Sequence, residues 1–315
     1  MCKGLHGRHI PHSSALTGTV PPSKTTRTHD GQALRSSLVT RPPSSSRSTP
    51  ARWLPHVATL AVLLGVWTLV AVSDVVEPHY LTPSPLEVWD AFVRANTDHA
   101  IGGGVDRVVR GEEGYYLWEH LVVSLQRIGA GLAIATVIGV PLGLLMGTSR
   151  IVGTLLGPYV DFLRSIPPLA YIGFLVAWFG IYNTSKIWLL VLAAFPPIAL
   201  ATVNGVRGVR EDQINAVLTL GASRRRAVTT VVLPATLPDI LSGLRVAIGF
   251  AWTTVVAAEL VNGLPGIGGL AYLSGTQNKI ALSIACIIVI GLTAIALDAV
   301  IRTIEKLLVP WRGKA

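Results

Sequence analysis

Charged side chains are scarce in this sequence. Asp, Glu, Lys and Arg together make up 14% of its 315 residues, whereas 50% of the residues are hydrophobic. A soluble domain typically carries about 25% charged residues. The composition therefore argues against an ordinary soluble enzyme or binding domain, and it indicates a protein that crosses a membrane several times.

Cysteine and the signatures of catalysis are also lacking. Cys2 lies in a polar tail and Cys286 in an apolar segment, so we expect no disulfide between them and no metal site. The sequence contains no G-x-x-x-x-G-K-[ST] loop, no H-E-x-x-H and no G-x-S-x-G. The glycine-rich GLPGIGG that begins one residue before Leu264 follows no predicted strand. We therefore expect neither enzyme activity nor a bound cofactor.

The first 52 residues form a separate region, rich in Ser, Thr, Pro and Arg and without apolar periodicity. Such a segment cannot bury enough apolar area to offset its ordering entropy, so we expect it to be disordered. Its poverty in acids is typical of a transit peptide and equally of a bacterial tail. Eight Lys and Arg face the single acid Asp30, which predicts a cytoplasmic location.

Six apolar segments approach the roughly 20 residues that a bilayer-spanning helix needs. They are expected at about 56–72, 121–146, 159–179, 187–203, 237–261 and 281–300.

A long polar stretch, 73–119, separates the first two of these segments. It holds nine acids and three bases, which predicts an external loop. Within it, Ser84 followed by Pro85 predicts the start of a short amphipathic helix, and the glycine-rich part at 102–114 predicts a flexible loop.

The distribution of basic residues predicts the topology. Of the 26 Lys and Arg, 18 fall in segments expected inside, 5 in segments expected outside and 3 in or near spans. By the positive-inside rule, the chain is an all-α integral membrane protein of six helices with both termini in the cytoplasm. Topology accounts for the net charge of +9, so we expect no binding to nucleic acid.

Small residues and prolines mark the predicted inside of the bundle. Gly139, Gly143 and Gly147 recur every four residues, which allows close helix packing; a hinge is the alternative. Two diprolines, Pro167-Pro168 and Pro196-Pro197, predict breaks in the third and fourth spans. Broken helices often line transport paths, although kinks that only shape the bundle fit as well.

Few charges fall near the apolar segments. Arg164, at the break in the third span, is a candidate contact for an anion on a translocation path, and an arginine that snorkels to the headgroups is the alternative. Glu259, at the outer end of the fifth span, is a candidate gate or substrate contact, or else an interfacial carboxylate. Arg127 and Arg245 are expected to anchor span ends. The predicted spans contain no chain of carboxylates, which argues against a proton-coupled carrier.

The connector at 205–236 is too basic to lie in hydrocarbon. Its segment NAVLTLGASRRRAVTTVVLP resembles the EAA loop of bacterial ABC importer permeases, whose pattern is E-A-A-x3-G-A-x5-F-x2-I-x-L-P. The matching positions are Ala216, Gly221, Ala222, Leu233 and Pro234. Asn215 stands where the pattern has Glu, which leaves open how this position contacts a partner.

The resemblance extends over roughly 54–312 to the permeases of taurine and alkanesulfonate importers, with nitrate and bicarbonate permeases in the same wider group. It is carried by LWEHLVVSLQRIGAG, SIPPLAYIGFLVAWFGIYNTSKI, LPDILSGLRVAIGFAWTTVVAAEL and VPWRG. This resemblance implies a type I importer permease domain over 53–315, in the cytoplasmic membrane. It further implies a second permease copy, a cytoplasmic ATPase dimer and a periplasmic or lipid-anchored binding protein.

In such a permease the loop forms coupling helices that dock on the ATPase. Small residues at Gly221 and Ala222 would let the turn nest against that partner. Ser223, Arg224 and Arg225 would form its polar, cationic rim, and Pro234 would end the second short helix before the fifth span. An ion-coupled carrier of the same solute and a receptor or assembly subunit without a path are the alternative functions.

Overall fold

The computed structural model describes residues 54–73, 81–100, 108–261 and 263–309, all within one compact unit, Arg52–Ala315. The predicted tail, 1–52, lies outside the described residues. The long helices are α1 (Leu54–Val72), α3 (Leu117–Thr148), α6 (Asn183–Gly208), α9 (Leu233–Glu259) and α11 (Ile280–Leu308). The shorter elements are α2 (Pro85–Ala95), β1 (Asp98–Ala100), β2 (Val108–Arg110), α4 (Arg150–Ser165), η2 (Pro168–Tyr171), α5 (Ile172–Phe179), α7 (Glu211–Thr219), α8 (Arg224–Ala227), η3 (Val228–Val232) and α10 (Ile267–Thr276).

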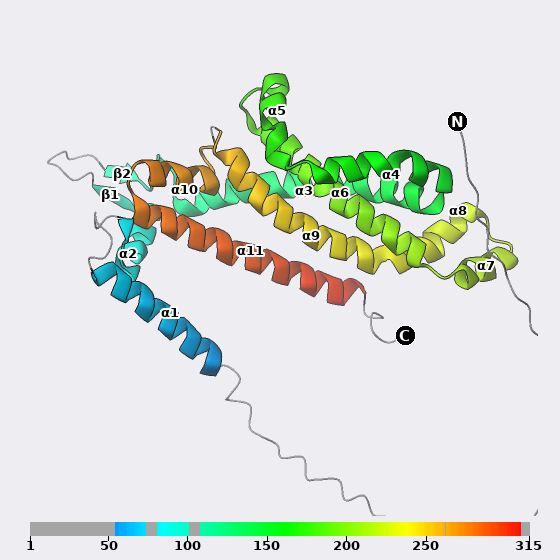
Figure 1. Cartoon of the computed structure of the whole chain (residues 1–315), viewed down its shortest axis with the longest axis horizontal. Helices are drawn as coiled ribbons and strands as arrows, with labels where there is room; N and C mark the ends of the chain where they lie inside the picture. The colour runs from blue at the N-terminus through cyan, green and yellow to red at the C-terminus, as the bar shows by residue number, and fades with distance from the viewer. Residues whose placement is uncertain (1–53, 74–80, 101–107, 262, 310–315) are drawn as a thin grey trace, which may run out of the picture. The chain divides into compact units, whose positions relative to one another are not determined.

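The predicted helical membrane fold is confirmed. Five helical stretches are long and apolar enough to cross a membrane, and a sixth is reached when α4 and the η2–α5 segment count as one bent span. Figure 1 places α7 and α8 at one end of the helices and α2, β1, β2 and α10 at the other. The polar segments predicted for opposite sides of the membrane therefore lie at opposite ends, while their sidedness stays a prediction.

The predicted external loop agrees with the structure at the start of α2 and differs from it in the part that follows. α2 begins where expected: Ser84 Oγ accepts the Glu87 backbone N–H, and the Glu87 side chain accepts the Ser84 N–H in return. The expected flexible loop is wrong over its described part, because β2 pairs antiparallel with β1 and Glu112 forms a bridge with Tyr115. Residues 101–107 of that loop lie outside the described residues.

The centre of the helices is α6, which makes its most extensive contacts with α3 and α9. Glycines on α3 allow the first of these contacts. A Cβ at Gly143 would lie 2.6 Å from Thr202 Cβ, and one at Gly147 would lie 2.5 Å from Val206 Cβ. The predicted packing face is therefore confirmed, since only hydrogen fits between the two helices at these positions.

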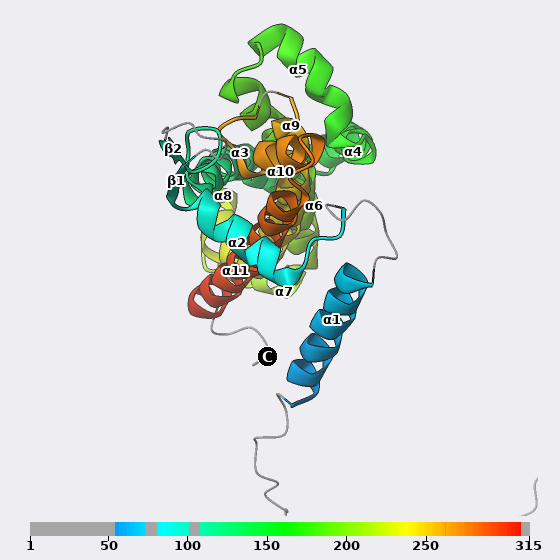
Figure 2. The ribbon, with the colours of Figure 1, turned by 90° about the vertical axis from the view of Figure 1, so that its left-hand side faces the viewer.

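The predicted break at Pro167-Pro168 is confirmed. Ile166, which precedes them, is extended with φ −88° and ψ 126°, as expected for a residue before proline. The chain bends by 95° between α4 and the η2–α5 segment, and α5 projects at an angle from the long helices in Figures 1 and 2, with only Leu175 buried against α6 and α9. The third predicted span, 159–179, is therefore not a single straight helix.

The predicted break at Pro196-Pro197 is wrong, because α6 continues through both prolines. α6 is covered on both sides by packed helices, and a Cβ at Gly243 of α9 would lie 3.1 Å from the Pro197 carbonyl oxygen. Neighbouring helices can stabilise a proline-containing helix in this way. The prolines still remove two N–H donors, which leaves the carbonyls of Leu192 and Ala193 without their usual intrahelical partners.

Candidate functional site

The connector forms the predicted helix–turn–helix. α7 ends in a Schellman motif, in which the Ala222 N–H donates to Val217 O and the Gly221 N–H to Leu218 O. Gly221 has φ +86° and open space around its missing Cβ. Its glycine is therefore explained by the left-handed backbone that the turn requires, rather than by close packing within this chain.

The second helix begins at Ser223, whose Oγ accepts the Arg226 N–H. Asn215, Ala216, Arg224 and Arg225 are exposed. No residue of α7 is buried, and Leu220 at the turn is 87% exposed. The loop thus presents an apolar tip with a cationic rim, and its role as the ATPase docking surface stays a prediction.

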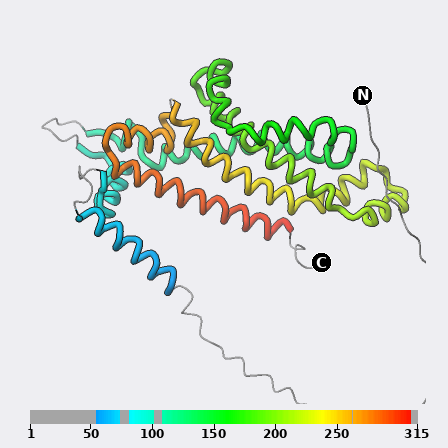
Figure 3. Tube along the Cα trace, in the orientation of Figure 1, coloured from blue at the N-terminus to red at the C-terminus, as the bar shows by residue number. Residues whose placement is uncertain are grey.

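The expectation that Pro234 ends the second short helix is wrong. α8, η3 and α9 form one helical run, Arg224–Glu259, of 36 residues (Figure 3). The missing proline N–H costs little here because the preceding turn is a π-helix, in which the hydrogen-bond ladder is already shifted by one residue. Leu233 is partly buried and Pro234 exposed within this run.

A cavity of about 420 Å³ lies between α4, η2, α6 and α9. It brings together most of the residues predicted for a translocation path: Arg164, Pro168, Pro196 and Pro197. The lining also includes Leu192 and Ala193, whose carbonyls have lost intrahelical donors, and the polar side chains of Asn204 and Ser242. Pro167 and Glu259 are not among the lining residues.

Arg164 is only weakly held. Its guanidinium pairs with Asp161 at 3.1 Å, and the two side chains are 62% and 56% exposed. An exposed pair of this kind contributes about 0–1 kcal/mol. Arg164 can therefore exchange Asp161 for another anion at the cavity without a large loss of stability.

The interpretation of Glu259 as an interfacial carboxylate is wrong, as is that of Arg127 as a lipid anchor. Glu259 is 1% exposed, and its Oε1 lies 2.6 Å from Arg127 Nη1. Arg245 is also no lipid anchor, because it pairs with Asp298 and Glu305 of α11. These charges fall in apolar segments, which is itself the signal for a specific role, but the pairing is not visible in the sequence.

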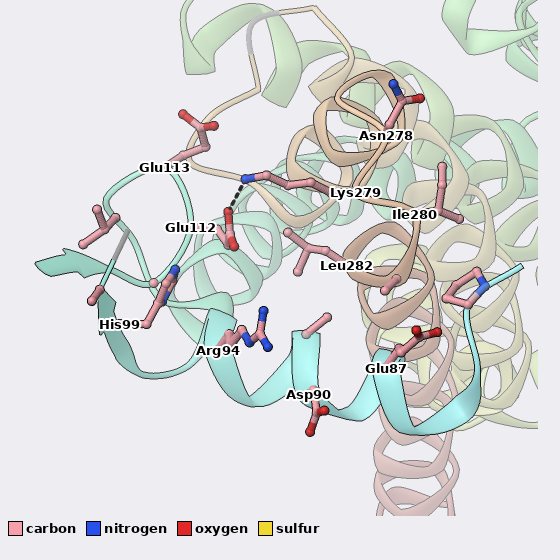
Figure 4. A pocket seen from close by; sticks show the side chains of 16 residues that line it. Glu87, Asp90, Arg94, His99, Glu112, Glu113, Asn278, Lys279, Ile280 and Leu282 are labelled. Atoms are coloured by element: carbon pink, nitrogen blue, oxygen red, sulfur yellow. Dashed lines mark hydrogen bonds and ion pairs between the residues drawn. The ribbon is translucent and has the colours of Figure 1, made fainter. Parts of the chain in front are cut away.

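A second, larger pocket of about 1020 Å³ lies between α2, the two strands and the start of α11 (Figure 4). Its lining carries four acids, Glu87, Asp90, Glu112 and Glu113, and the bases Arg94 and Lys279. Lys279 Nζ binds Glu112 Oε2 at 2.8 Å. This charged lining was not predicted, and it supports a location of the pocket outside hydrocarbon.

No group of three or more His, Cys, Asp or Glu among the described residues is placed to hold a metal ion. The candidate site is thus a surface loop joined by one helical run to a mostly apolar cavity that carries a few polar side chains. Such an arrangement can bind and move a solute.

Comparison with known proteins identifies the family. Residues 139–314 match the model of the binding-protein-dependent transport system inner membrane component. The taurine transport system permease protein TauC of Escherichia coli is 38% identical over 261 residues, which cover 82% of this chain and 90% of TauC. The nitrate import permease protein NrtB of Leptolyngbya laminosa is 33% identical over 84% of this chain and 91% of its own length.

Solved structures agree on the fold. The methionine ABC transporter MetNI, in an inward-facing form, superposes with a TM-score of 0.51 at 21% sequence identity, over 61% of this chain and 94% of the matched chain. The relatives of this chain are permease subunits whose ATPase is a separate partner, so this chain is a transport subunit rather than an enzyme. The chain therefore belongs to the family of binding-protein-dependent transport system inner membrane components, with the type I ABC importer fold.

Proposed function

We propose that this importer permease carries a small anion inward, with taurine or another aliphatic sulfonate as the favoured substrate. Within the family, the chain lies in the group of taurine, sulfonate and nitrate permeases. The observation that carries the proposal is the cavity beside Arg164, whose volume of about 420 Å³ falls in the usual range for small-molecule sites. Nitrate and bicarbonate are the alternative substrates.

The family and the two ends of the structure support a proposal for where the partners bind. The ATPase dimer is proposed to dock on α7, the Gly221 turn and α8, with both chain termini on that cytoplasmic side. The binding protein is proposed to act at the opposite end. The cavity is only partly enclosed by this chain, so a second copy of the chain is proposed to complete its wall.

Replacing Arg164 tests the anion path. The assay uses proteoliposomes that contain the whole complex, whose measured mass shows that it holds two permease copies. Arg164→Gln should lower taurine uptake there by about tenfold or more, because a hydrogen bond to a charged group contributes about 1.5–3 kcal/mol. Arg150→Gln, at the other end of α4 and away from the cavity, is the matched control. Unchanged uptake in Arg164→Gln contradicts the path.

The prolines of α6 distinguish taurine from a plain anion. The freed carbonyls of Leu192 and Ala193 are acceptors in the cavity wall, and taurine carries an ammonium group that can donate to them, whereas propanesulfonate does not. Pro196→Ala combined with Pro197→Ala restores two backbone donors. The ratio of taurine to propanesulfonate uptake should then fall about tenfold or more, the effect of one hydrogen bond from a charged group.

The binding protein is the same in both arms of this experiment, so a changed ratio reports on the permease. Pro141→Ala, inside α3 and away from the cavity lining, is the control. An unchanged ratio in the double variant contradicts a role of these carbonyls and leaves the anion path to the Arg164 result.

A further inference from the structure

The start of α10 is held by side chains of other helices. Its N-cap is Gly266, which has no side chain to cap the helix. The Gly266 N–H instead donates to His120 Nδ1 at 3.0 Å, the Ile267 N–H to Ser124 Oγ at 3.0 Å and the Gly268 N–H to Glu259 Oε2 at 2.8 Å. Three consecutive backbone donors that a helix leaves unsatisfied are thus accepted by α3 and α9.

The same side chains are bound to one another. Glu259 Oε1 accepts from Ser124 Oγ at 2.7 Å and from Arg127 Nη1 at 2.6 Å. Arg127 Nε donates to Asn183 Oδ1 at the start of α6, at 3.0 Å. We call His120, Ser124, Arg127 and Glu259 the outer latch; it joins α3, α6, α9 and α10.

The backbone of α10 is tightly packed against the outer latch. A Cβ at Gly266 would lie 2.6 Å from Arg127 Nη1 and 2.6 Å from Glu259 Cδ, and one at Gly268 would lie 2.7 Å from Val256 Cα. A buried ion pair is poor evidence for stability, because apolar residues of similar volume often hold a core as well. The role of the Arg127–Glu259 pair is therefore sought in the position of α10 rather than in overall stability.

The latch also lies at the end of the longest helical run. This run begins at Arg224 in the connector and ends at Glu259; it bends between α8 and α9 (Figures 1 and 3), and α9 itself is a helix of 27 residues, roughly 40 Å long. α9 is packed along α6, and a packed helix can carry a shift at one end to the other. Glu259 lies at the end of α9 that is remote from the connector, where it binds the start of α10.

We propose that Glu259 and Arg127 are positioning residues for transport, which hold α10 on the outer ends of α3 and α9 and make it follow α9. This inference rests on membership of the importer family and not on the identity of the substrate. Without the latch, the bundle keeps its fold while α10 separates from it, and uptake falls although the ATPase still binds.

Cysteine labelling tests the position of α10 directly. Ser274 of α10 is 2% exposed and Ala199 of α6 is fully buried, so Ser274→Cys reports on α10 and Ala199→Cys on the rest of the bundle. The full chain in membranes is treated with a small maleimide, and each labelled site is quantified by mass spectrometry. Glu259→Leu and Arg127→Met should each raise labelling at position 274 about tenfold, as local opening does, and leave position 199 protected.

Further variants separate positioning from folding. The double variant Arg127→Met, Glu259→Leu removes both charges of the pair but still lacks the cap, so position 274 should stay labelled. Glu259→Gln keeps an acceptor for the Gly268 N–H and should restore part of the protection. Arg110→Gln breaks the pair with Glu119 at the same end of the helices, and it should leave the labelling at position 274 unchanged.

Taurine uptake and copurification of the ATPase complete the test. Glu259→Leu and Arg127→Met should lower uptake about tenfold, within the range of known coupling effects, with normal ATPase binding. Protection of position 274 in both variants overturns the proposal, and so does equal labelling at positions 274 and 199, which would show a general fold determinant. The labelling result does not depend on the substrate, so it separates this proposal from the proposed function.

Discussion

A chain carrying Gly221→Glu is expected to lose copurification with its ATPase and to lose uptake altogether. Gly221 has φ +86° at the turn between α7 and α8, where a residue with a Cβ costs about 1–2 kcal/mol. The new carboxylate would also lie beside the exposed arginines of α8 and reduce the net positive charge of this surface. Both effects act on the surface proposed to dock, so association measured by affinity copurification should fall to background.

Two other variants show which effect dominates. Gly208→Glu adds the same charge to the same connector, at an exposed glycine with open space and no left-handed backbone, and it should retain association. Gly221→Asn should retain part of it, because Asn tolerates the left-handed conformation. Normal ATPase binding and full uptake in Gly221→Glu would show that this turn is not the docking element.

The second large effect is expected from Gly143→Leu on α3. A Cβ there would lie 2.6 Å from Thr202 Cβ and 2.7 Å from the Ala199 carbonyl oxygen, and backbone cannot yield as a side-chain tip can. Overpacking of this kind costs about 3 kcal/mol. We expect a lower thermal midpoint of the purified chain in detergent and a reduced amount in the membrane.

Gly129→Leu is the matched control for this prediction. Gly129 lies on the same helix and is exposed, and its missing Cβ has no neighbour within 4 Å. The helix propensity gained over glycine is the same at both positions. Equal thermal midpoints for the two variants would contradict the assignment of Gly143 to the interface between α3 and α6.

Much of the fold follows from the sequence because local chemistry determines it. Apolar length predicts the long helices, Ser84 and Pro85 predict the start of α2, and the spacing of glycines on α3 predicts a packing face. The connector between α6 and α9 is equally local, since its Schellman turn and the Ser223 cap involve residues within five positions of each other. These features are readable from one segment at a time.

The remaining features depend on contacts between distant segments. Arg127 and Glu259 are 132 positions apart, so two charges that separately resemble interfacial residues become one buried pair. Pro196-Pro197 has the same local chemistry as Pro167-Pro168, yet only the latter breaks its helix, because α3 and α9 cover α6. Burial by neighbouring helices decided both cases, and a single sequence carries no direct record of it.

The contact between α3 and α6 also constrains how this sequence can change over time. Gly131 faces Leu190, Gly143 faces Thr202 and Gly147 faces Val206, so each small residue is matched by one larger residue. A substitution that adds volume on α3 is tolerated only when the opposite residue on α6 loses a similar volume. Among homologues these positions should therefore vary as coupled pairs, with the sum of the two side-chain volumes held nearly constant while each one drifts.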